Sequence, residues 1–293
     1  MNKSCLIGFL MCSAFSLVVQ AATDGAHITK TISQIERKKG IKRTIQYRPD
    51  GNDFVCVNGK NRYTRALYGG ITDFRIETSD RPVFATYKPK DSKHICFRLQ
   101  CGNQSIALDS LKFCEARYRA GRRTYRLTDP LLGKGELNIS VLAFPDAEGG
   151  IWRFTMKDMP EGALLHCYIS EIRAKNLSRN GDMGADRADS FDAPQLPKEQ
   201  KHYKLSLDGT TAHIVVEDQE LRLPALVEGT SLYDKSEKWR SEIESSLQIS
   251  TPDPYFNPLG GALAAAADGI WDGKIWLHGA IGWRSQLNGW RAA

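Results

Sequence analysis

The sequence predicts a mainly β protein built on a large antiparallel β-sandwich, and three observations indicate this fold. Short segments of alternating apolar and polar residues recur from about Arg43 onward. Turn-forming pairs such as Asn58-Gly59 and Asp208-Gly209 separate them at the spacing of about 8–12 residues that is typical of all-β domains. Roughly ten or more strands in this rhythm favour two packed sheets over a barrel.

The composition is that of an ordinary globular protein. The chain has 293 residues, enough for one large or two ordinary domains, and 41% of them are hydrophobic. A net charge of +6 over this length gives no argument for nucleic acid as a partner. Beyond the first residues, no segment approaches the roughly 18 apolar residues of a membrane span. We therefore expect neither a nucleic-acid partner nor a transmembrane span.

Residues 1–21 have the pattern of a signal peptide. Lys3 supplies the positive charge, Cys5 to Val19 form a short apolar segment, and the small residue Ala21 ends a cleavage site. We expect the mature chain to be exported and to be periplasmic or associated with the cell surface.

Removal of this peptide leaves five cysteines, an odd number that gives no complete disulfide framework. They are Cys56, Cys96, Cys101, Cys114 and Cys167. Cys96 and Cys101 could pair across a tight turn, but small buried side chains on strands are the favoured interpretation.

The expected strands follow in order along the chain. The first lie near Ile45 and Phe54, and Asn58-Gly59 is expected to make a hairpin turn after the second. Further strands are expected at Ile71–Glu77, Val83–Tyr87, His94–Leu99, Lys112–Arg119, Arg122–Leu127, Glu136–Ala143, Ile151–Met156 and Ala163–Glu171. Tyr203–Leu207 and His213–Glu217 then form one more expected hairpin.

An aspartate-rich loop interrupts this rhythm between residues 176 and 197. Asp182 and Asp186 lie in it, with Arg179 and Arg187 interleaved. Clustered carboxylates can bind calcium or act as an acid/base pair, but the spacing does not match a calcium-binding loop. A solvated acidic loop is the favoured interpretation, and a loop that faces a substrate is the alternative.

The segment 116–126 carries five arginines among two tyrosines. Such interleaving can bind nucleic acid. A half-exposed hairpin with a charged outer face has the same pattern, because alternate residues of a strand face opposite sides. We favour the hairpin.

The pattern becomes helical near the carboxy terminus. A first helix is expected from Asp234 to about Ser246, with an apolar face at Trp239, Ile243 and Leu247. A second is expected from Leu259 to Trp271, capped by Asn257. Its alanines predict close packing on all sides.

Aromatic and basic residues gather after this helix. Flat aromatic faces and guanidinium groups suit a sugar site, and packing between helices explains the tryptophans equally well. The candidate residues are Trp276, His278, Trp283 and Arg284. The six histidines show no paired metal spacing and the chain has no CxxC, so we expect no metal site and no cofactor.

Several blocks of the chain resemble one known family. They are Arg65–Gly69, Phe74–Glu77, Asp80–Ala85, Glu115–Gly121, Asp129–Gly133, Gly181–Asp186, Thr251–Pro254, Trp276–Ala280 and Gly282–Arg284. Together they are similar to the domain-of-unknown-function family DUF4450, found at the amino terminus of large exported six-hairpin glycosidase-like proteins of polysaccharide-degrading bacteria.

The resemblance implies an amino-terminal β-supersandwich, a helical linker and an (α/α)6 six-hairpin toroid that carries the catalytic carboxylates. This chain looks like a truncated member, with the sandwich at 29–232, the linker at 233–250 and the start of an incomplete toroid at 251–293. Residues 194–231 look shorter than the equivalent part of the family. No catalytic residue can be carried over.

The sequence therefore favours the β-sandwich portion of an exported glycoside-hydrolase-like protein that acts on polysaccharide or oligosaccharide, inactive as this chain. Asp182 and Asp186 are the candidates for substrate contacts from the acidic loop. The alternative is a non-catalytic carbohydrate-binding or structural module, and a surface interaction protein with no role in sugar binding is a third hypothesis.

Overall fold

The computed structural model describes residues 46–88, 91–172 and 202–277. The predicted signal peptide and the aspartate-rich loop lie outside these residues, as do five of the six candidate site residues. These five are Asp182, Asp186, His278, Trp283 and Arg284.

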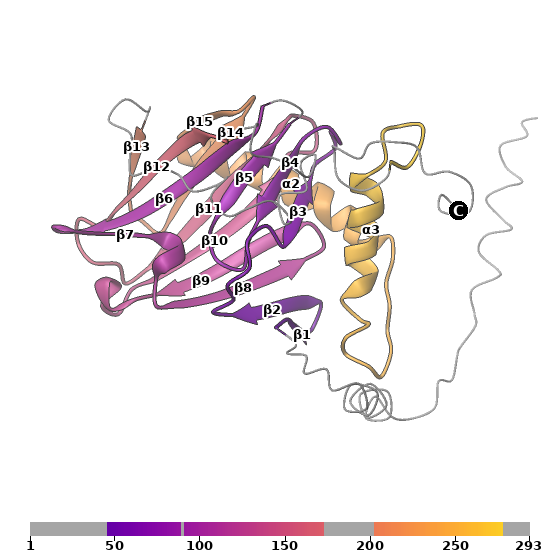
Figure 1. Ribbon diagram of the computed structural model, residues 1–293, viewed down its shortest axis with the longest axis horizontal. Coiled ribbons are helices and arrows are strands. Elements are labelled where there is room, and N and C mark those ends of the chain that lie inside the picture. The colour runs from indigo at the N-terminus through magenta and orange to yellow at the C-terminus, as the bar shows by residue number, and fades with distance from the viewer. Residues whose placement is uncertain (1–45, 89–90, 173–201, 278–293) are drawn as a thin grey trace, which may run out of the picture. The chain divides into compact units, whose positions relative to one another are not determined.

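The described chain is mainly β, with two antiparallel sheets and two helices (Figure 1). The first sheet has the strand order β1-β2-β8-β9-β10-β11-β14-β15. Its strands are β1 (Arg48–Asp50), β2 (Asp53–Val57), β8 (Phe113–Arg119), β9 (Arg122–Thr128), β10 (Glu136–Ala143), β11 (Gly149–Lys157), β14 (Thr211–Glu217) and β15 (Glu220–Arg222). We call it sheet A.

The second sheet, sheet B, has the order β13-β12-β6-β5-β4-β3, and β7 pairs with one end of β6. Its strands are β3 (Arg65–Tyr68), β4 (Arg75–Thr78), β5 (Phe84–Tyr87), β6 (Lys93–Cys101), β7 (Gln104–Ala107), β12 (Leu164–Glu171) and β13 (His202–Ser206). Single 3-10 turns, Leu108–Ser110 and Pro130–Leu132, accompany the strands.

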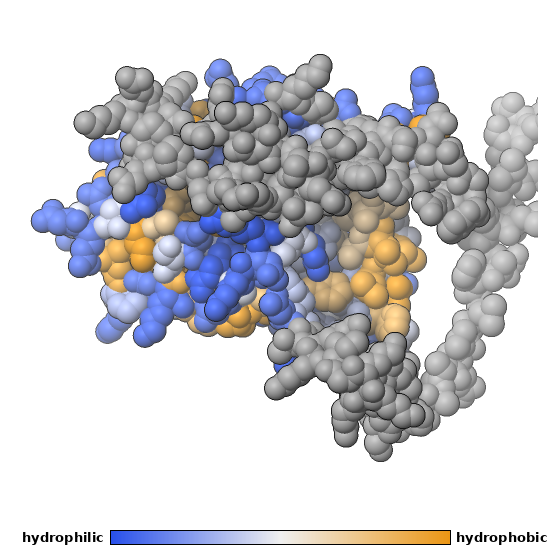
Figure 2. Space-filling model, in the orientation of Figure 1, coloured by the Kyte–Doolittle hydropathy of each residue, from blue (hydrophilic) through white to orange (hydrophobic). Residues whose placement is uncertain are grey.

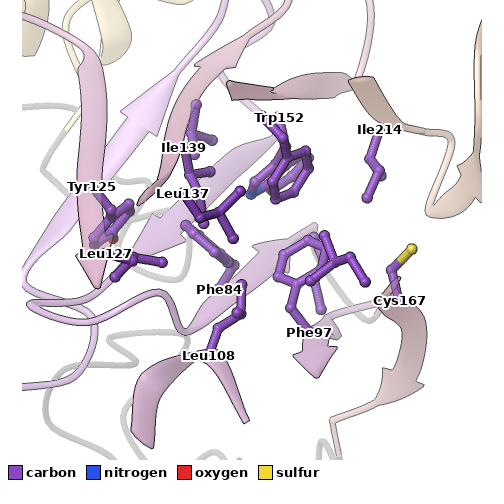
Figure 3. Packing of buried hydrophobic residues seen from close by; sticks show 14 of the residues in the cluster. Phe84, Phe97, Leu108, Tyr125, Leu127, Leu137, Ile139, Trp152, Cys167 and Ile214 are labelled. Carbon is purple, nitrogen blue, oxygen red and sulfur yellow. The ribbon is translucent and has the colours of Figure 1, made fainter. Parts of the chain in front are cut away.

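The core lies between the two sheets, because the inward-facing residues of both strand sets meet in one cluster. Phe84 on β5 forms edge-to-face contacts with Tyr125 on β9 and Trp152 on β11, with ring centroids 5.6 and 5.7 Å apart (Figure 3). Phe97 on β6 contacts Phe154 on β11 in the same way. Aromatic pairs in this geometry add to the free energy that apolar burial contributes.

The predicted strands after residue 71 are confirmed to within a few residues. Three strands, β3, β7 and β15, were not predicted, because strands this short show little alternation of apolar and polar residues. Ile71 does not begin a strand, because the amide of Phe74 donates to its carbonyl in a tight turn before β4.

Two predicted hairpins are wrong, and both errors have the same cause. The chain passes from sheet A to sheet B at Asn58-Gly59, since β2 pairs with β8 and not with β3. It passes back at Asp208-Gly209, because β13 pairs with β12 whereas β14 pairs with β11. A turn signal marks a reversal of the chain but does not say which sheet the next strand joins.

The arginine-rich segment is a hairpin, β8–β9, as predicted. Four of its five arginines face outward, but Arg123 points into the core and is fully buried. It donates to the backbone carbonyl of Ser79 and to the hydroxyl of Tyr47, both at 2.8 Å. The predicted half-exposed hairpin with a charged outer face is therefore confirmed, and Arg123 is the arginine that faces inward.

The cysteines are free thiols. Cys96 and Cys101 lie on the same strand, β6. The tight turn that could have brought them together comes after Cys101, at Gly102, and so does not lie between them. Five residues of extended chain span about 17 Å, which is far beyond the reach of a disulfide.

The first helix, α2 (Leu226–Ser245), begins eight residues before the predicted start. Its buried residues are Gly229, Tyr233, Ser236 and Arg240, and not the predicted apolar stripe. Gly229 allows the helix to lie against β14, because a Cβ there would be 2.5 Å from the ring of His213. Because α2 packs on sheet A, it buries a different face from the apolar face that the sequence predicts.

The second helix, α3 (Leu259–Gly269), contacts α2 and β3. Asn257 does not cap it, since its side chain bonds to the backbone amide of Thr251 at 2.7 Å. In the described residues α3 buries only Gly260 and Gly269, so the expected packing on all sides is wrong for this part of the chain. Neither described helix is long and apolar enough to cross a membrane.

Candidate functional site

An open groove of about 770 Å³ runs between α2 and α3. Its lining residues are Trp239, Glu242, Ile243, Ser246, Leu247, Leu263, Ala264, Ala267, Asp268, Trp271 and Trp276. We call it the tryptophan groove. Figure 2 shows hydrophobic residues gathered over α3, where the groove lies. An exposed apolar patch of this kind usually marks a surface on which a ligand or another part of a protein packs.

Two tryptophans form the exposed wall of the groove. Trp271 and Trp276 are 38% and 46% exposed, and their ring centroids lie 4.6 Å apart at a tilt of 48°. An aromatic pair in contact is held more rigidly than either ring alone. The two indoles therefore offer a broad apolar surface that is only partly covered.

A short local turn brings these two side chains together. Trp271 and Trp276 are paired as a single antiparallel bridge, and the amide of Leu277 donates to the carbonyl of Ile270 at 2.9 Å. Asp272 accepts the amides of Lys274 and Ile275 within the turn. Gly273 between them has a φ of 92°, which a residue with a side chain rarely adopts. The hydrogen bonds within the segment WDGKIW thus bring the two tryptophans together.

Glycines set the position of α3. A Cβ at Gly269 would lie 2.5 Å from Cγ of Tyr68, and one at Gly260 would lie 2.7 Å from the carbonyl of Leu247. The absence of side chains lets the helix approach both β3 and the end of α2 closely. The two glycines in the helix therefore have a packing role.

Charged groups attach α2 to the tip of the β8–β9 hairpin. Arg240 is 5% exposed and bonds to Glu237, to Glu244 and to the carbonyl of Ala120. Glu244 also accepts from Arg119 at 2.7 Å. Burial raises the pKa of Glu244, but hydrogen bonds from these two arginines outweigh it and lower the pKa overall. This network fixes one wall of the groove.

Asp268 is the carboxylate of α3 that faces the groove. Burial raises its pKa above the usual value. Asp268 and Trp271 both line the groove, although Trp271 lies just beyond the end of the helix. A flat aromatic surface beside a hydrogen-bonding carboxylate can hold a pyranose ring, with the indole against its C–H face and the carboxylate on a hydroxyl.

The structure places one predicted site residue in this groove, Trp276. The sequence analysis did not select Trp271 or Asp268, although both were visible as neighbours of Trp276 in a helix-then-turn segment. The turn signal Asp272-Gly273 between Trp271 and Trp276 could have indicated that these two residues lie together. The remaining candidates lie outside the described residues, so their position relative to the groove stays a prediction.

Histidines also meet on the outer face of sheet B. His166 Nδ1 lies 2.7 Å from His202 Nε2, and its Nε2 lies 2.6 Å from Gln100 Oε1. Burial, with the nearby charge of His202, lowers the pKa of His166. In the described ranges no group of three or more histidine, cysteine, aspartate or glutamate side chains could hold a metal ion.

Comparison with known families gives a match over the central strands. Residues 89–215 match a family described as Domain of unknown function (DUF4450). The family resemblance is confirmed over this segment. The match runs from the start of β6 into β14 and so includes the middle of both sheets. The helices and the tryptophan groove lie outside it, and no curated protein matches the chain.

Proposed function

We propose that this chain is the β-supersandwich portion of an exported glycoside-hydrolase-like protein and that it contacts saccharide through the tryptophan groove. The observation that carries the proposal is the exposed pair Trp271 and Trp276 beside Asp268. In this proposal the protein is periplasmic or cell-surface associated, and its partner is a polysaccharide or oligosaccharide.

The exposed indoles favour a ligand with both apolar and polar faces. Leaving such rings in water forgoes roughly 25 cal/mol for each Å² of apolar area that stays uncovered. A sugar ring covers an indole with its C–H face and offers hydroxyls to Asp268 and Glu242, which both line the groove. Stacking on tryptophan with a carboxylate at the edge is therefore a stable arrangement for a saccharide.

A supporting role fits the carboxylates of the sandwich better than catalysis does. Hydrolysis of a glycosidic bond needs an acid with a raised pKa and a second carboxylate facing it. Asp268 has a raised pKa, but Glu244 and Glu115, which line other pockets, form ion pairs with arginines. In our proposal the catalytic carboxylates belong to an (α/α)6 toroid, of which α3 resembles the first helix.

A non-catalytic structural module is the second candidate, and one observation favours it. Aliphatic side chains also line the groove, and Leu263 is 53% exposed. Further helices that pack on the groove would cover Leu263 and the tryptophans alike, whereas a sugar contacts mainly the tryptophans.

Affinity electrophoresis in gels that contain a series of plant and algal polysaccharides tests the proposal. We expect retention by at least one polysaccharide, and a loss of at least tenfold in affinity in Trp271→Ala and Trp276→Ala. Leu263→Ala is the matched control, because it removes apolar area from the same groove without removing a stacking surface. Retention by no glycan, or an equal loss in all three variants, would favour a packing surface and contradict saccharide contact.

The catalytic half of the proposal is tested separately by the release of reducing ends. We expect the purified chain to release none from the polysaccharides that retain it. Turnover that disappears in Asp268→Asn would place the chemistry in this chain and overturn the supporting role.

A further inference from the structure

A second pocket, of about 340 Å³, lies on the outer face of sheet A, beside α2. Its lining residues are Glu115, Arg117, Arg122, Thr124, Tyr125, Arg126, Asn138, Ile139, Ser140, Arg153, Thr155 and Tyr233. We call it the arginine pocket. Its volume lies in the range of small-molecule sites, which is about 300–1,000 Å³.

The strand register builds the floor of this pocket from two rows of polar side chains. Ser140 on β10 is paired with Thr124 on β9 and with Arg153 on β11. Asn138, two residues earlier, is paired in the same way with Arg126 and Thr155. Directly paired residues of neighbouring strands face the same side of a sheet, so each row presents its side chains together. The alternate residues of these strands fill the core.

Arg153 is the unusual member of the set. Its guanidinium lies over the ring of Tyr233, 3.5 Å from the centroid, and the Tyr233 hydroxyl bonds to Ser140 Oγ at 2.6 Å. Within the described residues Arg153 has no ion pair and no hydrogen bond. Stacking on Tyr233 thus fixes the plane of the Arg153 guanidinium, and the N–H groups of that guanidinium are unused. A planar guanidinium with free N–H groups can bind a carboxylate through two parallel hydrogen bonds.

The other three arginines of the pocket have acidic partners. Arg117 bonds to Asp50 and Glu115, Arg126 lies 3.3 Å from Glu136, and Arg122 lies 2.8 Å from Glu237. These pairs hold the rim in place and neutralise the charge of its three arginines. Arg122 Nε remains buried without a hydrogen-bond partner in the described structure. Arg153 is therefore the arginine of the pocket whose charge no described carboxylate pairs with.

We propose that the arginine pocket binds the carboxylate of an acidic sugar unit, with Arg153 as the carboxylate-binding residue. The pocket also contains three neutral hydrogen-bonding side chains on neighbouring strands, Thr124, Asn138 and Thr155. These side chains can form hydrogen bonds with the hydroxyls of the same sugar ring. This inference rests on the proposed function only in taking the ligand to be a saccharide, since the pocket and the groove share no residue.

Isothermal titration with polygalacturonate and with its carboxyl-reduced form tests the inference. We expect the wild-type chain to bind the acidic form at least tenfold more tightly than the reduced form. Arg153→Gln should abolish that preference, and Arg153→Lys should retain only part of it, because a lysine keeps the charge but not the two parallel bonds. Lys238→Gln, an exposed cation on α2, is the matched control and should keep the full preference.

The contrary outcomes are distinct. Equal affinity for the two polysaccharides, or a preference that Arg153→Gln leaves intact, overturns the inference. Inorganic phosphate that binds in place of polygalacturonate, with the same dependence on Arg153, shows a simple oxyanion site and also overturns it. Loss of the preference in Arg153→Gln but not in Trp276→Ala supports the arginine pocket even if the tryptophan groove binds no glycan. Thermal unfolding of each variant, followed by circular dichroism, shows whether the sheet is intact.

Discussion

Individual buried polar residues decide how the two sheets are joined. Arg123 on sheet A lies 3.9 Å from Asp80, and neither side chain is exposed. Asp80 accepts from the hydroxyl of Tyr47 and from the amide of Asn61, while Arg123 donates to the carbonyl of Ser79. A buried charge is stable only when it is paired and hydrogen-bonded, and here one nitrogen of Arg123, Nη1, has no hydrogen-bond partner in the described structure.

Replacing Arg123 with leucine should therefore lower the free energy of unfolding by about 3 kcal/mol, because Asp80 would stay buried without its compensating charge. Urea denaturation followed by circular dichroism measures the change. Arg48→Gln, an exposed arginine on β1, is the control and should be neutral. A loss below about 1 kcal/mol would show that the hydroxyl and amide donors suffice for Asp80.

His213 makes the stability of the protein depend on pH. It is 3% exposed, neither ring nitrogen has a hydrogen-bond partner in the described structure, and burial, followed by the charge of Arg153, lowers its pKa. Asp234 on α2 acts in the opposite direction but does not reverse the shift. The unfolded chain therefore takes up a proton first as the pH falls below about 6.5.

We expect the free energy of unfolding to decrease between pH 7.5 and 5.5, and His213→Leu to reduce that decrease. The sign follows from the lowered pKa, since protonation favours the state in which the imidazole is hydrated. The urea midpoint at the two pH values is the measurement. Lys238→Gln, at an exposed residue of α2, is the control, and an identical pH dependence in His213→Leu and wild type would contradict the prediction.

At the scale of elements, α2 is held to the β8–β9 hairpin mainly by charge. Glu244 is the shared acceptor of Arg119 and Arg240, at 2.7 and 2.8 Å. Its lowered pKa means that this contribution to stability is present at neutral pH and is lost as the pH falls below the ordinary glutamate value of about 4.3.

Glu244→Gln should lower the free energy of unfolding by about 1.5–3 kcal/mol at pH 7, the range for hydrogen bonds to charged groups. The difference from wild type should shrink at pH 3.5, because the unfolded chain already holds the proton below the ordinary glutamate value. Glu242→Gln, two residues away and exposed, is the control. A difference that is the same at both pH values would show that the effect is not electrostatic.

The approach of α3 to β3 depends on Gly269. Gly269→Ala places a methyl group within 2.5 Å of Cγ of Tyr68, an atom that cannot move away as the tip of a flexible side chain can. We expect a loss of about 1–3 kcal/mol and a change in the fluorescence of the nearby tryptophans. Gly209→Ala is the matched control, because a Cβ there would meet nothing within 4 Å.

At the scale of the whole molecule, one core joins the two sheets. Phe84 reaches from sheet B to two rings of sheet A, so Phe84→Ala should cost about 3–5 kcal/mol and destabilise both sheets together. Unfolding curves from tryptophan fluorescence and from circular dichroism should coincide in the variant. Phe256→Ala, at a side chain that is 46% exposed, should change stability by less than about 0.5 kcal/mol. Separate transitions for the two probes would show that the sheets unfold independently.

The sequence predicted the class of fold and most long strands because alternation is a local property. Glu136–Ala143 was predicted with the bounds that β10 has. Sheet membership depends on contacts between distant residues, and for that reason Asn58-Gly59 and Asp208-Gly209 were misinterpreted as hairpins. Arg123 was missed as a core residue because its partner Asp80 lies in another part of the sequence.

The candidate sites were predictable to different degrees. Trp276 was selected because the segment around it is rich in aromatic residues, which is visible in the sequence alone. The arginine pocket was not selected, although Arg117, Arg122 and Arg126 had been noted. Its central residue, Arg153, is isolated in the sequence, and only the pairing of β11 with β10 brings it to Ser140 and Thr124.

The order of strands in sheet B also bears on how the family can vary. β12 and β13 are adjacent antiparallel strands, so a hairpin of a few residues would be enough to join them, yet about 30 residues separate their ends. The register from Leu164 to Tyr168 fixes where β13 lies, whatever the length of the connection. Shortening it from about 30 to about 5 residues changes the closure entropy by only about 1.6 kcal/mol. The length of this connection can therefore change at a small cost in stability while the pairing of β12 with β13 stays the same.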